Sequence, residues 1–347
     1  MALPSDVSVA SEIIVPASGS TRSSLSASLM QVRAFWTVGA GQGALLAETL
    51  AGDGVLVTTL ASGISRGTEA LVFAGRVPPS QYEAMRAPLM GGAFPFPVKY
   101  GYAAVGRRDD GARVFVLHPH QDRFLAPAAM CIAVPDAVPT PRAVLAANME
   151  TALNISWDAA CLPGERVLVI GAGVVGMLTA SLLARIPGTE VTVVDIDPSR
   201  AARAAAFGCR FASPAAAPGA QDLVVHASAT EAGLRLALDR AGDEARIIEA
   251  SWYGDQAPGV PLGEAFHARR LRLIASQVGL VSPAMRGRVT HGQRLAIALR
   301  LLEDARYDAL LASPTRFADL PAAMPGLLAD GRGLCAVITY GNDECSD

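Results

Sequence analysis

The most constraining feature of the sequence is its longest apolar stretch, VLVIGAGVVGMLTASLLARI, at residues 167–186. It has the length of a membrane span, but its glycines cluster near one end and Arg185 lies near the other. Glycine often marks a change of chain direction because it adopts backbone conformations that other residues avoid. The stretch therefore predicts a buried strand, a tight glycine turn and a buried helix.

The rest of the chain shows two patterns of predicted secondary structure. Between residues 31 and 134, short β-type runs are broken by glycine and proline; they cover residues 32–38, 54–62, 103–108, 112–119 and 130–135. After Pro141, a long helical run precedes the glycine stretch, and strand-like and helix-like runs then alternate. This order predicts an α/β protein in which a β-rich domain is joined to a doubly wound parallel sheet.

Composition is that of an ordinary globular protein. The 347 residues suffice for two domains, and the net charge of −3 with 18% charged residues argues against a nucleic-acid or anionic-membrane partner. The five cysteines are scattered singly, so the sequence offers neither a disulfide framework nor a Cys-x-x-Cys metal site. We expect a reducing, cytoplasmic setting.

The glycine turn has the pattern of a dinucleotide-binding site. Gly171 would allow a tight turn, Gly173 would let a pyrophosphate approach the backbone, and Gly176 would let helix and strand pack closely. Val174 and Val175 open the predicted helix, whose free N–H groups attract phosphate charge. The alternative is that these are packing glycines without a ligand.

An acidic residue follows at the end of the next strand. Asp195 lies at about the expected 20-residue spacing from the first glycine, where a carboxylate accepts hydrogen bonds from ribose hydroxyls. Because it would repel a 2′-phosphate, NAD is favoured over NADP, although the nearby Arg200 weakens that preference. The alternative is a solvated strand end.

A β-rich half, a dinucleotide-binding half and a returning C-terminal segment resemble the medium-chain dehydrogenase/reductase superfamily, which includes the zinc alcohol dehydrogenases. The resemblance implies a GroES-like substrate domain at residues 29–150 and 300–347, and a Rossmann domain at residues 151–299. Residues 1–28, rich in Ser and Ala, would be a flexible extension. The resemblance also implies a nicotinamide in the cleft between the domains and a homodimer or homotetramer.

The zinc ligands of that family are largely missing. By resemblance, the first ligand position falls on Ser65, the histidine ligand falls on Tyr102 in KYGYAAVG, and the third falls on Glu150. Arg66 falls where some members touch the pyrophosphate. A hydroxyl and a phenol are poor zinc ligands, so we expect no zinc.

The motif SGIS-x-GTE at residues 62–69 resembles the zinc-lacking branch of the superfamily, which contains the bacteriochlorophyllide hydroxyethyl dehydrogenase. This resemblance is short, so the tetrapyrrole substrate is not carried over. A zinc-free enzyme of this kind needs another group to move the hydroxyl proton.

Several side chains could supply that proton chemistry. His118 has the unperturbed pKa nearest neutrality and is the first choice. Tyr102 could bond the substrate oxygen, with its pKa lowered by Lys99, the only lysine among 29 basic residues. Glu150 could orient one of these groups or bind the substrate. Each of them could instead be a packing or solvated residue.

Three functions remain open at this point. The leading hypothesis is a zinc-independent, NAD(H)-dependent oxidoreductase that acts on an alcohol/ketone pair of a polar small molecule. Reduction of an activated C=C bond and a non-catalytic dinucleotide sensor are the alternatives. A different metal site, from His118, His120 and Glu150, is conceivable, because alternate residues of a strand share one face. Trp252 or Tyr253 could shape the substrate pocket.

Overall fold

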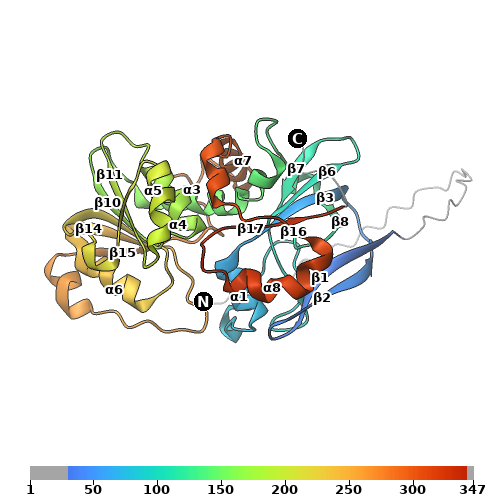
Figure 1. The fold of residues 1–347 in the computed structure, drawn as a ribbon, viewed down its shortest axis with the longest axis horizontal. Coiled ribbons are helices and arrows are strands. Elements are labelled where there is room, and N and C mark those ends of the chain that lie inside the picture. The colour runs from blue at the N-terminus through green and yellow to red at the C-terminus, as the bar shows by residue number, and fades with distance from the viewer. Residues whose placement is uncertain (1–29, 342–347) are drawn as a thin grey trace, which may run out of the picture.

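The computed structural model describes residues 30–341. The predicted extension, residues 1–28, lies outside the described residues, as do residues 342–347. The described chain forms two halves that lie side by side (Figure 1). We call them the β-rich half, with residues 31–133 and 315–339, and the parallel-sheet half, with residues 146–301.

The β-rich half contains two sheets, with strand orders β2-β1-β5-β4 and β16-β17-β3-β6-β7-β9, and β8 pairs with β3. Its strands are β1 (Gln31–Gly39), β2 (Gln42–Thr49), β3 (Val55–Ile64), β4 (Gly91–Gly92), β5 (Val98–Lys99), β6 (Ala104–Arg108), β7 (Arg113–Val116), β8 (Arg123–Ala126), β9 (Ile132–Ala133), β16 (Thr315–Arg316) and β17 (Ala336–Thr339). Its helices are α1 (Arg66–Phe73) and α8 (Leu320–Ala329). The C-terminal strand β17 pairs antiparallel with β3, so the last part of the chain returns to this half.

The parallel-sheet half has one six-stranded parallel sheet in the order β12-β11-β10-β13-β14-β15. Its strands are β10 (Arg166–Ile170), β11 (Glu190–Val194), β12 (Arg210–Ala212), β13 (Gln221–His226), β14 (Ala241–Glu249) and β15 (Arg272–Ala275). The helices are α3 (Ala146–Ala159), α4 (Val174–Leu183), α5 (Ala201–Ala206), α6 (Glu231–Arg240) and α7 (His291–Leu301), and the short α2 (Thr140–Ala143) precedes them. The predicted α/β fold with a doubly wound parallel sheet is confirmed.

The first part of the long apolar stretch, residues 167–170, lies in β10, inside this sheet. Val167, Leu168 and Val169 of β10 are fully buried, as expected for a strand covered on both faces. Helix α4 follows directly, and most of its side chains are buried too. No helix within residues 30–341 is long and apolar enough to cross a membrane.

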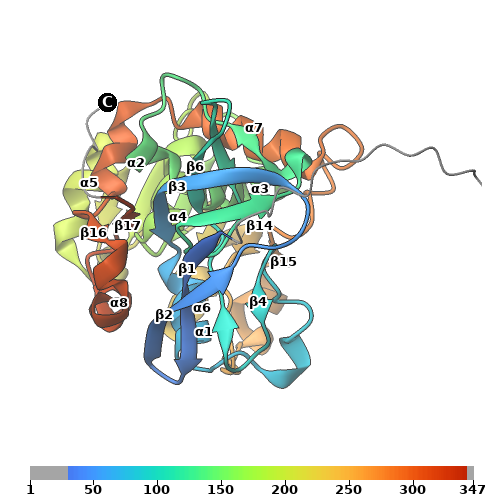
Figure 2. The same ribbon diagram turned by 90° about the vertical axis from the view of Figure 1, so that its right-hand side faces the viewer.

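The two halves share one hydrophobic core. A single cluster of buried side chains runs from Val105 and Phe115 in the β-rich half through α3 to Val167 in the parallel sheet. Figure 2 shows β3 crossing in front of α3 and α4. The joint core packs the β-rich half against the parallel-sheet half.

The sequence did not predict strand β2. Its residues, QGALLAET, include Ala, Leu and Glu, which favour helices, and few β-branched or aromatic side chains. Pairing with β1 along its whole length overrides that propensity. Helix α8 packs beside β2.

Candidate functional site

The glycine turn, residues 171–176, joins β10 to α4 at the point where the strand order reverses. Gly171 has a φ of +107°, and a Cβ there would lie 2.8 Å from the backbone of Ala227. A Cβ on Gly176 would lie 1.9 Å from the carbonyl oxygen of Gly171. A Cβ on Gly173 would meet nothing within 4 Å. Two glycines are thus required by packing, while Gly173 faces the open space that an approaching ligand needs.

Helix α4 presents an uncapped N-terminus to that space. Its N-cap residue is Gly173, which has no side chain to satisfy the first N–H groups, those of Val174 and Val175. The helix dipole adds partial positive charge at this end. The turn and the helix terminus therefore fit a phosphate group.

Asp195 is tied directly to the glycine turn. Its Oδ2 accepts a hydrogen bond from the backbone N–H of Ala172 at 2.7 Å and lies 2.8 Å from Nη1 of Arg200. Arg200 also lies 3.3 Å from Asp197 and donates to the carbonyl oxygen of Gly331. The carboxylate is thus placed at the edge of the proposed cofactor site with one arginine as counter-ion.

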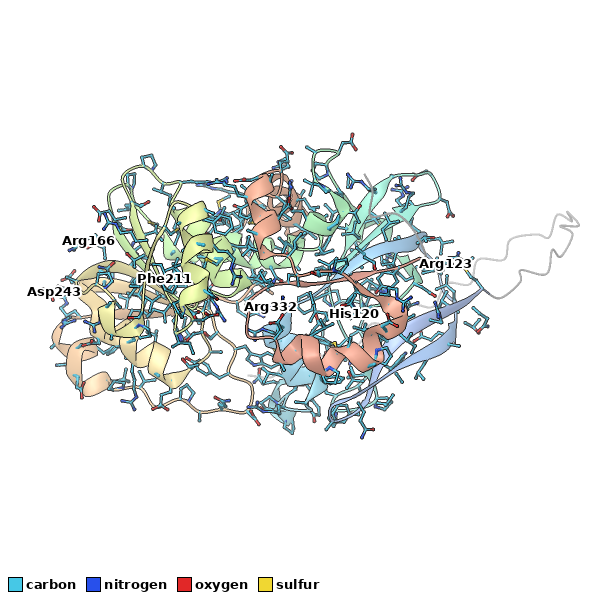
Figure 3. The ribbon with its side chains drawn as sticks, viewed as in Figure 1. His120, Arg123, Arg166, Phe211, Asp243 and Arg332 are labelled. Atoms are coloured by element: carbon cyan, nitrogen blue, oxygen red, sulfur yellow. The ribbon has the colours of Figure 1, made fainter. Side chains whose placement is uncertain are left out.

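Arg66 approaches the same place from the other half. It opens α1 and donates to the carbonyl oxygen of Asp330 at 2.9 Å. The loop after α8 also lies against the glycine turn, since a Cβ on Gly333 would be 3.3 Å from the carbonyl oxygen of Ala172. Figure 3 shows Arg332 of this loop at the boundary between the halves. The sequence did not indicate that residues 330–333 border this site.

Ser65 and Tyr102 are the two altered ligand positions, and the Ser65 hydroxyl is near enough to Tyr102 to act on its pKa. Burial raises the pKa of Tyr102 to about 12, the charge of Glu69 adds to this rise, and the hydroxyls of Ser65 and Thr68 oppose it. Tyr102 is therefore a neutral phenol near pH 7 and can donate a hydrogen bond. We call Ser65, Thr68 and Tyr102 the hydroxyl site.

The prediction that Lys99 lowers the pKa of Tyr102 is wrong. The Lys99 Nζ atom lies 2.7 Å from Oε2 of Glu48 and 2.8 Å from Oε1 of Gln121. It also lies 5.7 Å from the centre of the Trp36 ring. These contacts compensate its charge between β5 and β2, and burial dominates the titration of Tyr102.

His118 was chosen because its unperturbed pKa lies nearest neutrality, and that reason does not hold in the folded protein. Its ring stacks on Phe124 with centroids 3.7 Å apart, and its Nδ1 lies 2.8 Å from the carbonyl oxygen of Pro119. Burial lowers the pKa of His118 to about 3. A side chain with an unperturbed pKa near neutrality was expected, but the buried imidazole is neutral and only a weak base.

Glu150 is engaged in an ion pair away from these groups. Its Oε1 accepts from Nε of Arg294 at 2.9 Å, and both side chains are buried. Arg294 also binds Oδ1 of Asn154 and the carbonyl oxygens of Val278 and Leu280. Burial raises the pKa of Glu150, and Arg294 opposes that rise. This network ties α3 to α7 and to residues 278–280.

The donor set does not fit a zinc ion. Ser65 and Tyr102 offer oxygens that bind zinc poorly, and Glu150 is held by Arg294. Within residues 30–341, no three His, Cys, Asp or Glu side chains are grouped as metal ligands. The alternative metal site from His118, His120 and Glu150 required both histidines to lie on one face of a strand. Residues 117–120 instead form a loop after β7.

Behind the hydroxyl site lies a buried polar chain that runs from Glu69 through His120 and Ser62 to Tyr340. Oε1 of Glu69 accepts from the backbone N–H of Ser65 at 2.7 Å, and Oε2 lies 3.0 Å from Nε2 of His120. Nδ1 of His120 lies 2.7 Å from Oγ of Ser62, which lies 2.8 Å from the Tyr340 hydroxyl. Figure 3 shows His120 inside the β-rich half.

A second polar cluster lies at the carboxyl ends of β13 and β14. The fully buried His226 has Nδ1 2.8 Å from Oε2 of Glu249 and Nε2 2.7 Å from Oγ of Ser228. The hydroxyl of Tyr253 donates to the same carboxylate at 3.1 Å. The backbone N–H of Ser251 donates to Oε1 of Glu249 at 2.8 Å. This network fixes the loops after both strands beside the glycine turn.

The loop after β14 reaches across to the β-rich half. Trp252 packs against the cluster that contains Phe94 and Tyr100, which Tyr102 also joins. Three residues on, Asp255 binds Nη2 of Arg76 at 2.7 Å. Trp252 and Tyr102 thus pack against the same cluster of side chains, and the role of Trp252 or Tyr253 in a substrate pocket stays a prediction.

Comparisons with known proteins point in one direction. No protein-family model matches the chain. L-galactonate-5-dehydrogenase of Escherichia coli K12 is 31% identical over 121 residues, which is 34% of either chain. A short chain alcohol dehydrogenase of E. coli CFT073, solved with NADH, has a TM-score of 0.73 and 16% identity over 89% of this chain and 99% of its own. L-idonate 5-dehydrogenase of E. coli K-12 has a TM-score of 0.73 and 14% identity over 90% and 99%.

These similarities define the fold class. The chain has the fold of dehydrogenases that join a β-rich half to a parallel, dinucleotide-binding sheet. The sequence match spans about a third of the length of the curated relative. The relationship of this chain to the zinc-lacking branch stays a prediction.

Proposed function

We propose that the chain is an NAD(H)-dependent oxidoreductase that interconverts an alcohol and a ketone in a polar small molecule. The observation that carries this proposal is the glycine turn, in which Gly173 alone faces open space beside Asp195 and an uncapped helix terminus. The solved dehydrogenase with NADH, which shares the fold, supports the same cofactor class. Galactonate and idonate, the acids named for two similar proteins, are the first substrates to test.

Each part of the site has a role in this proposal. Gly173, Val174 and Val175 bind the pyrophosphate through backbone N–H groups, and Asp195 binds the adenosine ribose. A bound nicotinamide would supply the hydride donor or acceptor for the carbinol carbon. Tyr102 donates a hydrogen bond to the substrate oxygen and exchanges its proton with it.

We further propose that the reaction needs no zinc. Zinc would act as a Lewis acid on the substrate oxygen, and its usual thiolate and imidazole ligands are replaced by Ser65 and Tyr102. The phenol of Tyr102 is neutral near pH 7, so it can supply a proton to a developing alkoxide. Elemental analysis of the purified, active protein that gave about one zinc per chain would contradict this part.

For the protein as a whole, we propose a homodimer in the reducing cytoplasm. Strand β15 forms a free edge of the parallel sheet among the described strands, and Leu273 on it is 38% exposed. The cysteines within residues 30–341 are unpaired thiols. Light scattering in solution would test the dimer.

Two measurements test the main proposal. Quenching of NADH fluorescence gives the affinity, and a single turnover with L-galactonate and NAD⁺ shows whether hydride is transferred. The same mixture with an enone and NADH tests C=C reduction. Cofactor binding without transfer to any substrate would favour the non-catalytic alternative.

A further inference from the structure

Arginine side chains hold all four backbone carbonyl oxygens of the loop between α8 and β17, residues 330–333. Three arginines from outside the loop donate to these oxygens: Arg66 to Asp330 at 2.9 Å, Arg200 to Gly331, and Arg203 to Arg332 at 2.5 Å and to Gly333 at 3.4 Å. Arg200 and Arg203 belong to the parallel-sheet half, so the loop is tied across the boundary between the halves. We call residues 330–333 the latch loop.

The latch loop also packs directly against the glycine turn. Gly333 has a φ of +70°, and a Cβ there would lie 3.3 Å from the carbonyl oxygen of Ala172 and 3.2 Å from Cζ of Arg200. Both distances are shorter than ordinary van der Waals contact, so a side chain at this position would push the loop away from the turn. A Cβ on Gly331, in the same loop, would meet nothing within 4 Å. The close packing therefore depends on Gly333 and not on Gly331.

Arg200 occupies part of the carboxylate that the proposed function assigns to the adenosine ribose. A carboxylate has roughly four acceptor positions. Oδ2 of Asp195 accepts from the backbone N–H of Ala172 at 2.7 Å and from Nη1 of Arg200 at 2.8 Å. Its Oδ1 accepts from the backbone N–H of Asp197 at 3.0 Å. A ribose with two neighbouring hydroxyls therefore lacks an acceptor for one of them as long as Arg200 stays in place.

The same guanidinium also restricts access to the carboxylate. The side chain of Asp195 is 8% exposed and that of Arg200 is 11% exposed. One Nη atom of Arg200 lies on Asp195, and the other donates to the carbonyl oxygen of Gly331. The guanidinium thus connects the ribose carboxylate to the latch loop, and the two must separate before both ribose hydroxyls reach Asp195.

We propose that Arg200 and the latch loop close the adenosine end of the cofactor site and must open before the dinucleotide binds. The inference rests on the proposed function. On opening, the loop leaves the glycine turn and the guanidinium leaves Oδ2 of Asp195, which frees the second acceptor for the ribose. The closed contacts compete with the cofactor, so the measured Kd is the Kd of the open state divided by the open fraction.

The first test loosens the latch loop from the arginine side. Arg203→Met removes two hydrogen bonds to the loop and leaves the ribose carboxylate untouched. We expect NADH to bind about tenfold faster and its Kd to fall, because the open fraction rises. Arg269→Met is the matched control, since Arg269 also donates to two backbone carbonyl oxygens, those of Asp239 at 2.9 Å and Ala241 at 2.7 Å, at the amino end of β14. The control should bind NADH at the native rate.

The second test loosens the latch loop from its own side. Gly333→Ala places a Cβ against the glycine turn, and it should speed NADH binding in the same way as Arg203→Met. Gly331→Ala is the control within the loop, because its Cβ meets no neighbour and its carbonyl oxygen is kept. It should leave the binding rate unchanged. If one loosened variant does not fold, the other decides.

Stopped-flow fluorescence of NADH at increasing concentration measures these rates. When opening precedes binding, the observed rate of the native protein levels off at the opening rate, and the loosened variants should raise this plateau about tenfold. A linear rise with one slope in the native protein and both loosened variants overturns the inference, and so does weaker NADH binding in those variants. In either case NADH still binds, so the proposed cofactor stands. If neither the native protein nor the loosened variants bind NADH, the proposed function fails and the inference fails with it.

Discussion

The glycine turn and the hydroxyl site are built in opposite ways. The turn is made of neighbouring residues, and its backbone conformation forms the proposed phosphate site. A Cβ would clash at Gly176 but not at Gly173. The hydroxyl site uses side chains from separate segments, with Ser65 before α1 and Tyr102 after β5. The charge of Glu69 raises the pKa of Tyr102, and Glu69 is itself paired with His120, which is 51 residues away in sequence.

The difference teaches where local sequence suffices. A turn between a buried strand and a buried helix leaves little conformational choice, so its geometry follows from the order of residues. A side-chain site depends on which segments the fold brings together. Changes at the turn should therefore affect binding and stability, whereas changes at the hydroxyl site should affect the rate.

The largest effect is expected for Tyr102→Phe. Loss of the phenolic O–H removes the proposed proton donor, so kcat should fall about 10²- to 10⁴-fold while NADH binding is retained. Steady-state kinetics and fluorescence titration measure the two quantities. Tyr100→Phe, at the neighbouring ring 6.0 Å away, is the matched control. Equal losses in both variants would show that packing matters and that the Tyr102 hydroxyl does not.

The glycine turn should respond differently at its two glycines. Gly176→Ala places a Cβ 1.9 Å from a backbone oxygen, and overpacking of this kind costs about 1–3 kcal/mol of unfolding free energy. Gly173→Ala should leave stability nearly unchanged but weaken NADH about tenfold, or about 1.4 kcal/mol. Denaturant unfolding and fluorescence titration separate these outcomes. Intact NADH affinity in Gly173→Ala would place the cofactor elsewhere.

The same contrast explains what could be predicted. The strand, the turn, the helix and Asp195 were predicted because each follows its neighbour in sequence, and the structure places Asp195 against Ala172. The role of His118 was argued from its free pKa, which burial against Phe124 changes. Lys99 was expected to lower the pKa of Tyr102, yet the fold pairs its ammonium group with Glu48. Nothing in the sequence around Glu69 or around His120 indicated that the two side chains form a pair.

His118 gives a prediction for stability against pH. Its pKa is about 6.5 when unfolded and about 3 when folded, so the unfolded state binds more protons between these values. Its contribution is fully present above pH 6.5, and stability should fall by up to about 1.4 kcal/mol per pH unit as the pH drops towards 3. His118→Phe should flatten this slope in denaturant unfolding, whereas His267→Asn, at an exposed position, should not. Equal slopes in all three proteins would contradict the buried, neutral state of His118.

The smallest effect is expected in the choice of cofactor. Asp195→Ser removes the carboxylate that disfavours a 2′-phosphate and frees Arg200, its partner at 2.8 Å, to bind one. The ratio of NADPH to NADH affinity should rise about tenfold, which corresponds to about 1.4 kcal/mol. Asp197→Asn weakens the other contact of Arg200, at 3.3 Å, without removing the ribose partner, and should shift the ratio much less. Fluorescence titration of both cofactors decides this, and a native protein that already prefers NADPH would show that Arg200, and not Asp195, sets the selectivity.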